Sequence, residues 1–485
     1  MTDDRYGQSG PTLRWESDCP GSDAHAWIEV RDKFTGEVFA RVARGSSAHV
    51  DRAIADAFAS RNACRAAPPH ARAAALTHIA DAVARAAEHF AQTMVRETGK
   101  TIRDCRAEVG RCIDTFRLSA HEAVGSAAAG HWVDMGISPR TSGYQAVIRR
   151  FPVGVCSFIT PFNFPLNLIA HKIGPAIAAG CPWVLKPADK TPVTALLLAE
   201  ILQSAGLPDG SWSVIPALVE DSNALIEDDR VALLSFTGSA RVGYALKARA
   251  GRKRVTLELG GNAACIVEPD ADLEHVAQRL TLGAFGANGQ SCISVQRVYA
   301  HEQIFQPLID LLTARARALV VGDPRDEHTD VGPLISEADA VRIEEWLGEA
   351  QTRHARILCG GVRRGSFFEP TWLTAVPADA RISCQEVFGP VALIEPYASF
   401  EDALTRVNSS EFGLQAGIFT RELAKARRAF ETLEVGGVVI NDSPTMRSDA
   451  LPYGGVKQSG IGREGVRSAI EELTEVRVML VSGTP

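Results

Sequence analysis

Apolar residues recur at helical spacing through the first quarter of the chain. Ser46 and Ser47 offer N-caps for a helix through Val50, Ile54 and Phe58. A longer helix is predicted next, because a set of apolar residues falls on one face before Gly99 ends the pattern. This set is Leu76, Ile79, Ala80, Val83, Ala87, Phe90 and Met94.

A third helix is predicted from Thr101 to about Val124, with Cys105 and Cys112 on its apolar stripe as core residues. Two short extended pieces are predicted ahead of the helices, at residues 26–30 and 37–39. The first part of the chain is therefore expected to be mainly helical.

From Tyr144 the pattern changes to short apolar runs that alternate with helical stretches. The predicted strands are 145–155, 155–159, 183–186, 212–215, 233–236 and 255–259, and the predicted helices are 166–179, 194–205 and 240–250. Such alternation predicts a parallel, doubly wound sheet. Sheets of this kind bind ligands at the carboxyl ends of their strands.

A second α/β unit is predicted from Ala263 to about Val439, with helices at 273–287, 305–319, 335–350 and 400–407. The tail from Asn441 is rich in glycine and ends in an apolar, strand-like run at 475–481. A terminal apolar strand is an edge that needs a partner. Together with the 147–148 region, it suggests pairing in an oligomer.

The composition is that of an ordinary soluble globular protein, with 46% hydrophobic and 22% charged residues. The length of 485 residues suggests about three domain-sized units. Acidic and basic residues are mixed at a net charge of -7, so we expect no nucleic-acid surface. No run approaches the roughly 18 apolar residues of a spanning helix, and the N-terminus lacks an export signal, so we expect a cytoplasmic protein without membrane contact.

The ten cysteines are scattered and none forms a Cys-x-x-Cys pair, so neither a zinc ribbon nor another metal site is expected. Cys292 stands apart in Gly289-Gln290-Ser291-Cys292, a turn followed by a β-prone run. A thiol in such a turn can be a nucleophile. Taken alone, the residue is better described as a small buried hydrophobe, and the other segments have to support the nucleophile.

Polar residues follow several of the predicted strands. Asn163 lies between Pro161 and Pro165, where its amide can donate to an oxyanion, or it is simply a turn asparagine. Lys186 and Asp189 follow the next strand, where they can hold a ribose or a phosphate, or they form a surface turn.

Two further strand ends carry candidate chemistry. Phe236-Thr237-Gly238-Ser239 leads into a helix and has the ingredients of a phosphate site, although it is not a Gly-x-Gly-x-x-Gly motif. Glu258 is flanked by leucines, a setting that raises a carboxyl pKa and suits a general base. The alternative for Glu258 is a solvated glutamate at a strand end.

Together these segments resemble the aldehyde dehydrogenase superfamily from about residue 25 to the end of the chain. The matching stretches are 160–165, 185–188, 236–239, 257–261, 289–292, 386–390, Asn408 with 413–414, and 452–457. The interval of 34 residues between Glu258 and Cys292 also agrees with the family's spacing.

The resemblance implies oxidation of an aldehyde to a carboxylic acid with a nicotinamide cofactor. Cys292 would be the nucleophile, Asn163 and the Cys292 N–H would bind the oxyanion, and Glu258 would activate water to hydrolyse the thioester. The positions that the resemblance assigns to the cofactor are Ile159, Thr160, Pro161, Phe162, Lys186, Asp189, Gly238, Ser239, Val242, Leu259, Gly260, Glu386 and Phe388. NAD is expected because Asp189 would repel a 2′-phosphate, and NADP remains the alternative because Lys190 adjoins it.

The implied fold is α/β, with a Rossmann-type cofactor domain, an α/β catalytic domain and a small bridging sheet that builds homodimers or homotetramers. The expected boundaries are 1–127 and 148–259 for the cofactor domain, 260–440 for the catalytic domain, 128–147 and 470–485 for the bridging sheet, and 441–469 for the substrate mouth and the return to the cofactor domain.

The substrate is expected to be a small hydroxy- or anionic aldehyde, since the 441–447 loop resembles the branch with lactaldehyde, non-phosphorylating glyceraldehyde-3-phosphate and phosphonoacetaldehyde dehydrogenases. The expected substrate contacts are Phe164, Leu168, His171, Ser291, Ile293, Arg447 and Arg111. Arg447, with Arg111 or Arg117, can bind an anion, or it is a structural arginine that pairs with a carboxylate. Ser291 stands where phosphate-specific members of the branch often have arginine, which weighs against a phosphate group.

The sequence is compatible with two other functions. A coenzyme A-acylating semialdehyde dehydrogenase would pass the thioester to coenzyme A, and Glu258 argues against it because that route does not need this base. A non-catalytic scaffold on the same fold would not need Cys292, Glu258 and Asn163, all of which are present.

Overall fold

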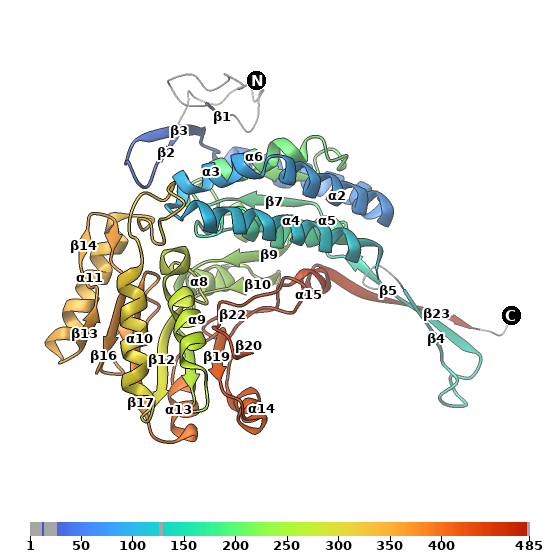
Figure 1. Ribbon diagram of the computed structural model, residues 1–485. Helices are drawn as coiled ribbons and strands as arrows, with labels where there is room; N and C mark the ends of the chain where they lie inside the picture. The colour runs from blue at the N-terminus through green and yellow to red at the C-terminus, as the bar shows by residue number, and fades with distance from the viewer. Residues whose placement is uncertain (1–11, 14–26, 126–129, 483–485) are drawn as a thin grey trace.

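The computed structural model describes residues 12–13, 27–125 and 130–482 of the chain. Two α/β units lie against each other, and a three-stranded arm projects away from both (Figure 1). Several expectations fall partly outside the described residues, namely Ala26 of the first predicted strand, the N-terminal end of the cofactor domain, and the ends 128–129 and 483–485 of the bridging sheet.

Helices occupy the first part of the chain, as predicted. They are α1 (Ser47–Ala66), α2 (Pro69–Arg85), α3 (Ala87–Thr98) and α4 (Ile102–Val124), preceded by strands β1 (Thr12–Leu13), β2 (Trp27–Arg31) and β3 (Val38–Ala43). Ser46 is the N-cap of α1, and Thr101 caps α4 by accepting from the Asp104 N–H at 3.2 Å.

The single long helix predicted over 76–94 is wrong, because the structure has two helices there. Ala86 has φ −98° and ψ 13°, a bridge conformation that ends α2 and starts α3. The apolar stripe continues across the break, with Leu76 and Phe90 both buried in one core, so the spacing alone could not reveal it. Gly99 ends α3 in the left-handed conformation, with φ 75°.

The first unit contains a six-stranded sheet in the order β22-β10-β9-β6-β7-β8, and all neighbours except β22 are parallel. Its strands are β6 (Val155–Ile159), β7 (Trp183–Lys186), β8 (Trp212–Val214), β9 (Val231–Thr237), β10 (Arg254–Glu258) and β22 (Gly460–Ile461). The connecting helices are α5 (Asn167–Ala179), α6 (Pro192–Leu202), α7 (Ala224–Glu227) and α8 (Ala240–Arg249). The predicted parallel, doubly wound sheet is confirmed.

Two apolar cores cover the faces of this sheet. Helices α2, α4, α5 and α6 pack on one face around Phe158 and Leu185, and α1 and α7 pack on the other around Val184 and Leu234. Alternate residues of one strand therefore enter different cores, which explains the continuous apolar runs in the sequence. Helix α15 (Val466–Glu472) from the tail packs beside α5.

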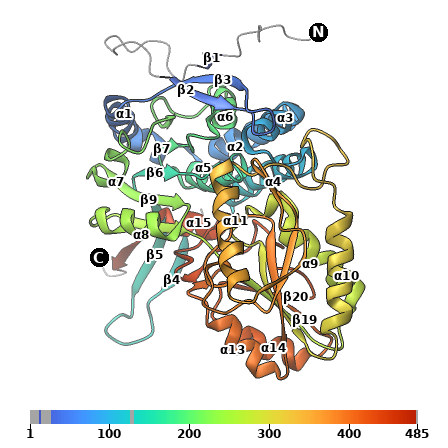
Figure 2. The ribbon, with the colours of Figure 1, turned by 90° about the vertical axis from the view of Figure 1, so that its left-hand side faces the viewer.

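The second unit contains a seven-stranded sheet in the order β13-β16-β17-β12-β11-β19-β20. Its strands are β11 (Ala263–Val267), β12 (Val295–His301), β13 (Arg356–Cys359), β16 (Thr371–Thr374), β17 (Val391–Tyr397), β19 (Gln415–Phe419) and β20 (Gly437–Ile440). Its helices are α9 (Leu273–Phe285), α10 (Phe305–Ala318), α11 (Glu337–Thr352), α12 (Arg381–Cys384), α13 (Phe400–Asn408) and α14 (Leu423–Thr432). Figure 2 shows α10 and α11 standing along the length of this unit. Short pairs complete the fold: β14 (Arg363–Arg364) with β15 (Phe367–Phe368), and β18 (Phe412–Gly413) with β21 (Val456–Lys457).

The projecting arm is a three-stranded sheet in the order β23-β5-β4. Strand β23 (Thr474–Ser482) pairs antiparallel with β5 (Tyr144–Pro152), so that Met479 lies opposite Val147, and β4 (His131–Asp134) covers the other side of β5. The predicted terminal strand is confirmed. Strand β5 runs across the expected boundary at 147/148, so residues 148–152 lie in the arm with the segment before them.

No helix in the described part of the chain is long and apolar enough to span a membrane. The same residues contain no group of three or more His, Cys, Asp and Glu side chains arranged to hold a metal ion.

Candidate active site

The carboxyl ends of the parallel strands bring the predicted residues of the first unit together. Ile159 pairs in register with Lys186 and with Phe236, and Glu258 pairs with Thr237. These strand ends face the second unit, and a cavity of about 810 Å³ lies at this junction.

The cavity collects most of the predicted site residues. Those that line it are Arg111, Pro161, Phe162, Asn163, Phe164, Leu168, Gly238, Ser239, Glu258, Leu259, Gly260, Ser291, Cys292, Ile293, Glu386, Phe388 and Arg447. Those that do not line it are Ile159, Thr160, His171, Lys186, Asp189 and Val242.

A strained turn presents the thiol of Cys292. Ala287 and Asn288 both have positive φ, 50° and 58°, which is uncommon for residues other than glycine. The Asn288 side chain holds this geometry by donating to the Gly99 and Pro333 carbonyls at 3.0 Å each and by accepting from the Gly332 N–H at 2.8 Å. Gly289 follows at φ 68°, and a Cβ there would lie 2.2 Å from the Gly389 oxygen, so only glycine fits.

The Cys292 side chain is half-buried, and its Sγ lies 3.4 Å from the Tyr453 hydroxyl. Burial raises the pKa of the thiol to about 12, against the opposing effects of Tyr453 and Arg447. Among its neighbours, Tyr453 and Arg447 are thus the groups that favour the thiolate form.

Asn163 lies in the loop after β6 with its amide nitrogen directed at the thiol loop. This side chain is buried, and its Nδ2 donates to the Gln290 carbonyl at 2.9 Å. A primary amide has two N–H donors, so one remains for a ligand beside Cys292. Its Oδ1 is buried without a hydrogen-bond partner among the residues that the structure describes.

Glu258 ends β10 and faces the cavity from the first unit. It is buried, and neither carboxylate oxygen has a hydrogen-bond partner within residues 27–125 and 130–482. Burial raises the pKa of Glu258 well above its usual value, and Glu464 adds to the shift. The alternative of a solvated strand-end glutamate is therefore wrong, and a buried unpaired carboxyl of this kind is typical of a functional site.

The turn after β9 has the geometry of a cradle for a phosphate. The Gly238 N–H donates to the Glu258 carbonyl at 3.0 Å, and a Cβ on Gly238 would lie 2.4 Å from the Phe236 ring. Ser239 is the N-cap residue of α8 and lines the cavity, so the positive end of that helix faces the space.

Glu386 and Phe388 approach the same cavity from the second unit. The Gly261 N–H donates to Glu386 Oε1 at 2.9 Å, and burial raises the pKa of this carboxyl to about 7. Phe388 has a positive φ of 53°, and its ring meets Phe162 edge to face at 5.8 Å between centroids. Two aromatic rings from different units thus enclose one side of the space.

Lys186 and Asp189 lie beyond the cavity wall, after β7. The Lys186 ammonium donates to Asp189 Oδ1 at 2.8 Å, and Lys186 is 5% exposed whereas the Asp189 side chain is 42% exposed. The alternative of a simple surface turn does not describe a buried lysine. The pair lies on the strand next to β6, along the edge that carries Ile159 and Thr160.

His171 was expected to face the substrate, and this expectation is wrong. Its side chain is 3% exposed and lies between two carboxylates, 3.0 Å from Asp449 Oδ1 and 3.4 Å from Glu464 Oε2. Every residue of α5 is buried, so helical spacing cannot tell the cavity face from the core face.

Arg447 lines the cavity and belongs to the same network. Its Nη2 lies 3.3 Å from Glu464, its Nε lies 3.2 Å from Asp449, and its guanidinium stacks 3.6 Å from the centroid of the Tyr453 ring. Arg111 from α4 also donates to Asp449, at 3.0 Å. Although burial favours the neutral acid, His171, Arg111 and Arg447 hold the pKa of Asp449 well below its usual value.

Several residues of this site, Asp449 among them, were missed by sequence reasoning. Tyr453 lay in a recognised motif without an assigned role, and nothing indicated that Glu464 and Lys172 form a buried ion pair of 3.0 Å behind Glu258. Each contact joins positions far apart in the chain, and the one available signal was a lysine on a mainly apolar helix.

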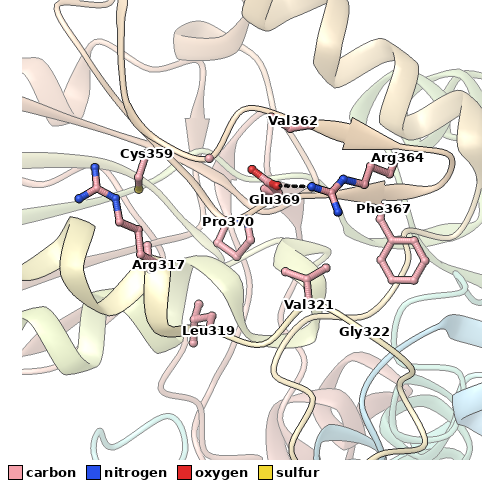
Figure 3. A pocket seen from close by; sticks show the side chains of 12 residues that line it. Arg317, Leu319, Val321, Gly322, Cys359, Val362, Arg364, Phe367, Glu369 and Pro370 are labelled. Carbon is pink, nitrogen blue, oxygen red and sulfur yellow. Dashed lines mark hydrogen bonds and ion pairs between the residues drawn. The ribbon is translucent and has the colours of Figure 1, made fainter.

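A second cavity, of about 520 Å³, lies where the end of α10 meets the β14–β15 hairpin (Figure 3). Arg317, Cys359 and Arg364 are among its lining residues, and Arg364 pairs with Glu369 at 3.5 Å. None of the predicted site residues lines this cavity, so the chemistry belongs to the larger one.

Comparisons with known proteins agree with this geometry. A family model described as the aldehyde dehydrogenase family matches residues 20–479. The 3-sulfolactaldehyde dehydrogenase of Priestia aryabhattai is 43% identical over 94% of this chain and 95% of its own length.

Two solved structures are also similar. Aldehyde dehydrogenase 21 from Physcomitrella patens, in complex with the reaction product succinate, is 43% identical, with a TM-score of 0.94 over 98% of this chain and 99% of that one. A glyceraldehyde-3-phosphate dehydrogenase from Methanocaldococcus jannaschii, complexed with NADP, is 36% identical, with a TM-score of 0.90 over 94% and 99% of the two chains.

Proposed function

Since the chain belongs to the aldehyde dehydrogenase family, it oxidises an aldehyde with NAD(P), and we propose that its substrate is a small aldehyde with a sulfonate or carboxylate at the far end. The observation that carries this proposal is the pair Arg111 and Arg447, which line the same cavity as Cys292. Both guanidinium groups share Asp449 as a partner, so they lie close together in the cavity wall.

The two arginines have N–H donors left with which to bind an anion. No partner for Nη1 of either side chain is found among the described residues, and each guanidinium has five N–H donors. Charged hydrogen bonds from such forks are the usual means of recognising carboxylates and related anions. Ser291 rather than arginine precedes Cys292, which favours a sulfonate or carboxylate over a phosphate.

The relatives support an anionic substrate. One is named for 3-sulfolactaldehyde, which carries a sulfonate, and a solved structure of another holds succinate, a dicarboxylate product. In both molecules a short chain separates the anion from the reacting carbon. This chemistry fits a cavity that Arg111 and Arg447 line together with Cys292.

The residues fit the cofactor on the side of the first unit. The Gly238 turn has no room for a side chain, and the N-terminus of α8 opens onto it. NAD(P), when bound, supplies the hydride acceptor. Within the proposal, Ser239 holds the pyrophosphate, Glu386 a ribose, and Phe162 and Phe388 enclose the nicotinamide side.

The proposed roles of the chain's own groups follow from their positions. The Cys292 thiolate adds to the aldehyde carbon, and Asn163 Nδ2 with the Cys292 N–H stabilises the oxyanion. After the hydride has left, the acid is bound as a thioester. Glu258 takes a proton from water, the water oxygen adds to the thioester carbon, and Cys292 leaves as its thiolate.

The test is NADH or NADPH formation with a panel of aldehydes: 3-sulfolactaldehyde, succinic semialdehyde, lactaldehyde, glycolaldehyde and glyceraldehyde-3-phosphate. 3-Sulfolactaldehyde and succinic semialdehyde, the sulfonate and carboxylate members of the panel, should give the highest kcat/KM. Equal rates with neutral aldehydes would contradict the proposal. Running the panel with and without coenzyme A separates the acylating alternative, since loss of turnover without coenzyme A would favour it.

Replacing Arg111 with glutamine should raise the KM for anionic aldehydes by roughly 10- to 100-fold, the effect expected from the loss of one charged hydrogen bond. The KM for lactaldehyde should change by less than about threefold, because a neutral aldehyde makes no ion pair. Arg117→Gln is the matched control, since Arg117 lies on the same helix but pairs with Asp81 at 3.6 Å outside the cavity. Equal losses on charged and neutral aldehydes would show that Arg111 is only structural.

We also propose that NAD is preferred over NADP, because the Asp189 carboxylate lies beside Lys186 where an adenosine ribose would sit. Asp189→Ser should raise kcat/KM with NADP by about tenfold, equivalent to about 1.4 kcal/mol, since it removes the repulsion of a 2′-phosphate and frees Lys186. Steady-state kinetics with both cofactors measures this ratio. A wild-type enzyme that already prefers NADP would contradict the assignment.

We further propose that the arm assembles the chain into a homodimer or homotetramer. Val476, Val478, Met479 and Leu480 of β23 are each more than half exposed, and β23 is an edge strand. An exposed apolar edge is a template for pairing with another chain. Light scattering of the full chain should give a multiple of 52.0 kDa, and a monomer at micromolar concentration would contradict this proposal.

A further inference from the structure

The Tyr453 hydroxyl points at the sulfur of Cys292, a contact that the proposed roles above leave unused. The residue is 6% exposed, and its Oη lies 3.4 Å from Cys292 Sγ. In the part of the chain that the structure describes, this sulfur is the one hydrogen-bond partner of the Tyr453 hydroxyl. A buried tyrosine O–H needs a partner, and here that partner is the reacting atom itself.

The ring is fixed from both sides of the site. The Tyr453 backbone exchanges hydrogen bonds with Glu464, whose carboxylate holds Lys172 at 3.0 Å and Arg447 at 3.3 Å. Arg447 in turn lies over the Tyr453 ring at 3.6 Å. The hydroxyl is therefore held in place by a closed set of contacts, Tyr453 to Glu464 to Arg447 and back to the ring.

The order of titration determines which group donates. Burial raises the pKa of Tyr453 well above its usual value, and burial raises the pKa of Cys292 to about 12. A phenol ordinarily keeps its proton to a higher pH than a thiol, so when the thiol ionises its sulfur accepts the tyrosine O–H. The Arg447 cation over the ring face draws electron density from the phenol and makes the O–H a stronger donor.

We propose that Tyr453 is a catalytic residue of this enzyme, whose hydroxyl donates a hydrogen bond to the Cys292 thiolate and so increases the fraction of reactive sulfur. The bond is made to the free thiolate and is lost when sulfur bonds to the aldehyde carbon. Its effect therefore appears in the formation of the nucleophile and again when the thiolate leaves the thioester. The inference rests on the proposed role of Cys292 and does not depend on which aldehyde is oxidised.

The test measures the thiol directly. The full chain, without cofactor, is treated with iodoacetamide across a range of pH, and the alkylation rate of the Cys292 peptide is followed by mass spectrometry. Tyr453→Phe should lower that rate roughly tenfold at mildly alkaline pH and move the profile up by about one pH unit, the shift expected for one lost hydrogen bond to a charge. Cys384 is exposed and serves as an internal reference in the same digest.

Two comparisons keep the inference open to refutation. Tyr244→Phe is the matched control, because the Tyr244 hydroxyl donates to the Lys457 carbonyl at 2.8 Å instead of to the thiol, and its profile should equal that of the wild type. Incorporating 3-fluorotyrosine in place of all tyrosines keeps every hydroxyl group but makes it a stronger donor. The alkylation profile of Cys292 should then move in the opposite direction, to lower pH. An unchanged Cys292 profile in a folded Tyr453→Phe protein, or in the fluorinated protein, would overturn the role of Tyr453.

Failure of the nucleophile assignment and failure of the anionic-substrate proposal can be distinguished from failure of the Tyr453 role. If Cys292→Ala keeps full turnover, the nucleophile assignment fails whatever Tyr453 does. If the aldehyde panel favours neutral substrates, the anion proposal fails and the alkylation result stands.

Discussion

Replacing Cys292 with alanine is expected to abolish aldehyde-dependent NADH formation, with a loss on the order of 10⁴-fold or more. Without the sulfur no thiohemiacetal forms, and the aldehyde hydrogen has no tetrahedral carbon from which to leave as hydride. NADH absorbance with saturating aldehyde measures the loss. Cofactor binding, followed by protein fluorescence, should stay within about twofold of the wild type.

The control for this prediction is Cys384→Ala. Cys384 ends α12 in the second unit, is exposed, and lies outside the cavity, so its removal should leave turnover intact. NADH formation by Cys292→Ala at the wild-type rate would mean that the strained turn presents an ordinary thiol and that the nucleophile lies elsewhere.

The second large effect is expected from Glu258→Gln. Glutamine has the shape of glutamate but cannot take a proton from water, so the thioester should form and then accumulate. We expect a burst of about one NADH per Cys292 followed by turnover slower by roughly 10²- to 10⁴-fold, the usual contribution of a general base. Rapid mixing with absorbance detection resolves the burst.

The pH dependence of steady-state turnover is a second test of Glu258 as the general base. Burial raises the pKa of this carboxyl, so the base form is scarce at low pH and increases as the pH rises. Steady-state turnover of the wild type should therefore rise with pH, and Glu258→Gln should lose that rise. Glu395→Gln is a matched control, since burial also raises the pKa of Glu395, to about 7, and its carboxylate accepts from the Val376 N–H outside the cavity. A Glu258→Gln protein with no burst and normal turnover would exclude the general-base role.

The sequence predicted the first sheet well because its strands are buried on both faces. Continuous apolar runs such as Val155–Ile159 can be recognised without knowing their partners. In the second unit the strands are less regular, and β19 contains Gly417, where a Cβ would lie 2.8 Å from the Asp442 oxygen. Glycine lowers strand propensity, so β19 was not predicted as a separate strand.

The site was predictable to the extent that its residues lie at strand ends or in recognised motifs. Asn163, Glu258 and Cys292 fulfil that condition, and they meet in one cavity. Contacts between remote positions were beyond reach: Cys292 and Tyr453 are 161 residues apart, and Arg111 and Asp449 are 338 apart. No periodicity encodes such pairs, because they follow from how the two units dock.

The Asn288 turn makes the reactivity of the thiol a property of the assembled molecule. Its side chain is tied to Gly99 at the end of α3 and to Gly332 and Pro333, and Asn163 of the first unit is tied to Gln290 in the same loop. In a chain still emerging from the ribosome, with the second unit undocked, Cys292 would be a thiol of ordinary reactivity. A substitution of Gly99, inherited or engineered, would place a Cβ 2.5 Å from the Pro333 oxygen. Such a protein would lose activity although all of its catalytic groups are intact.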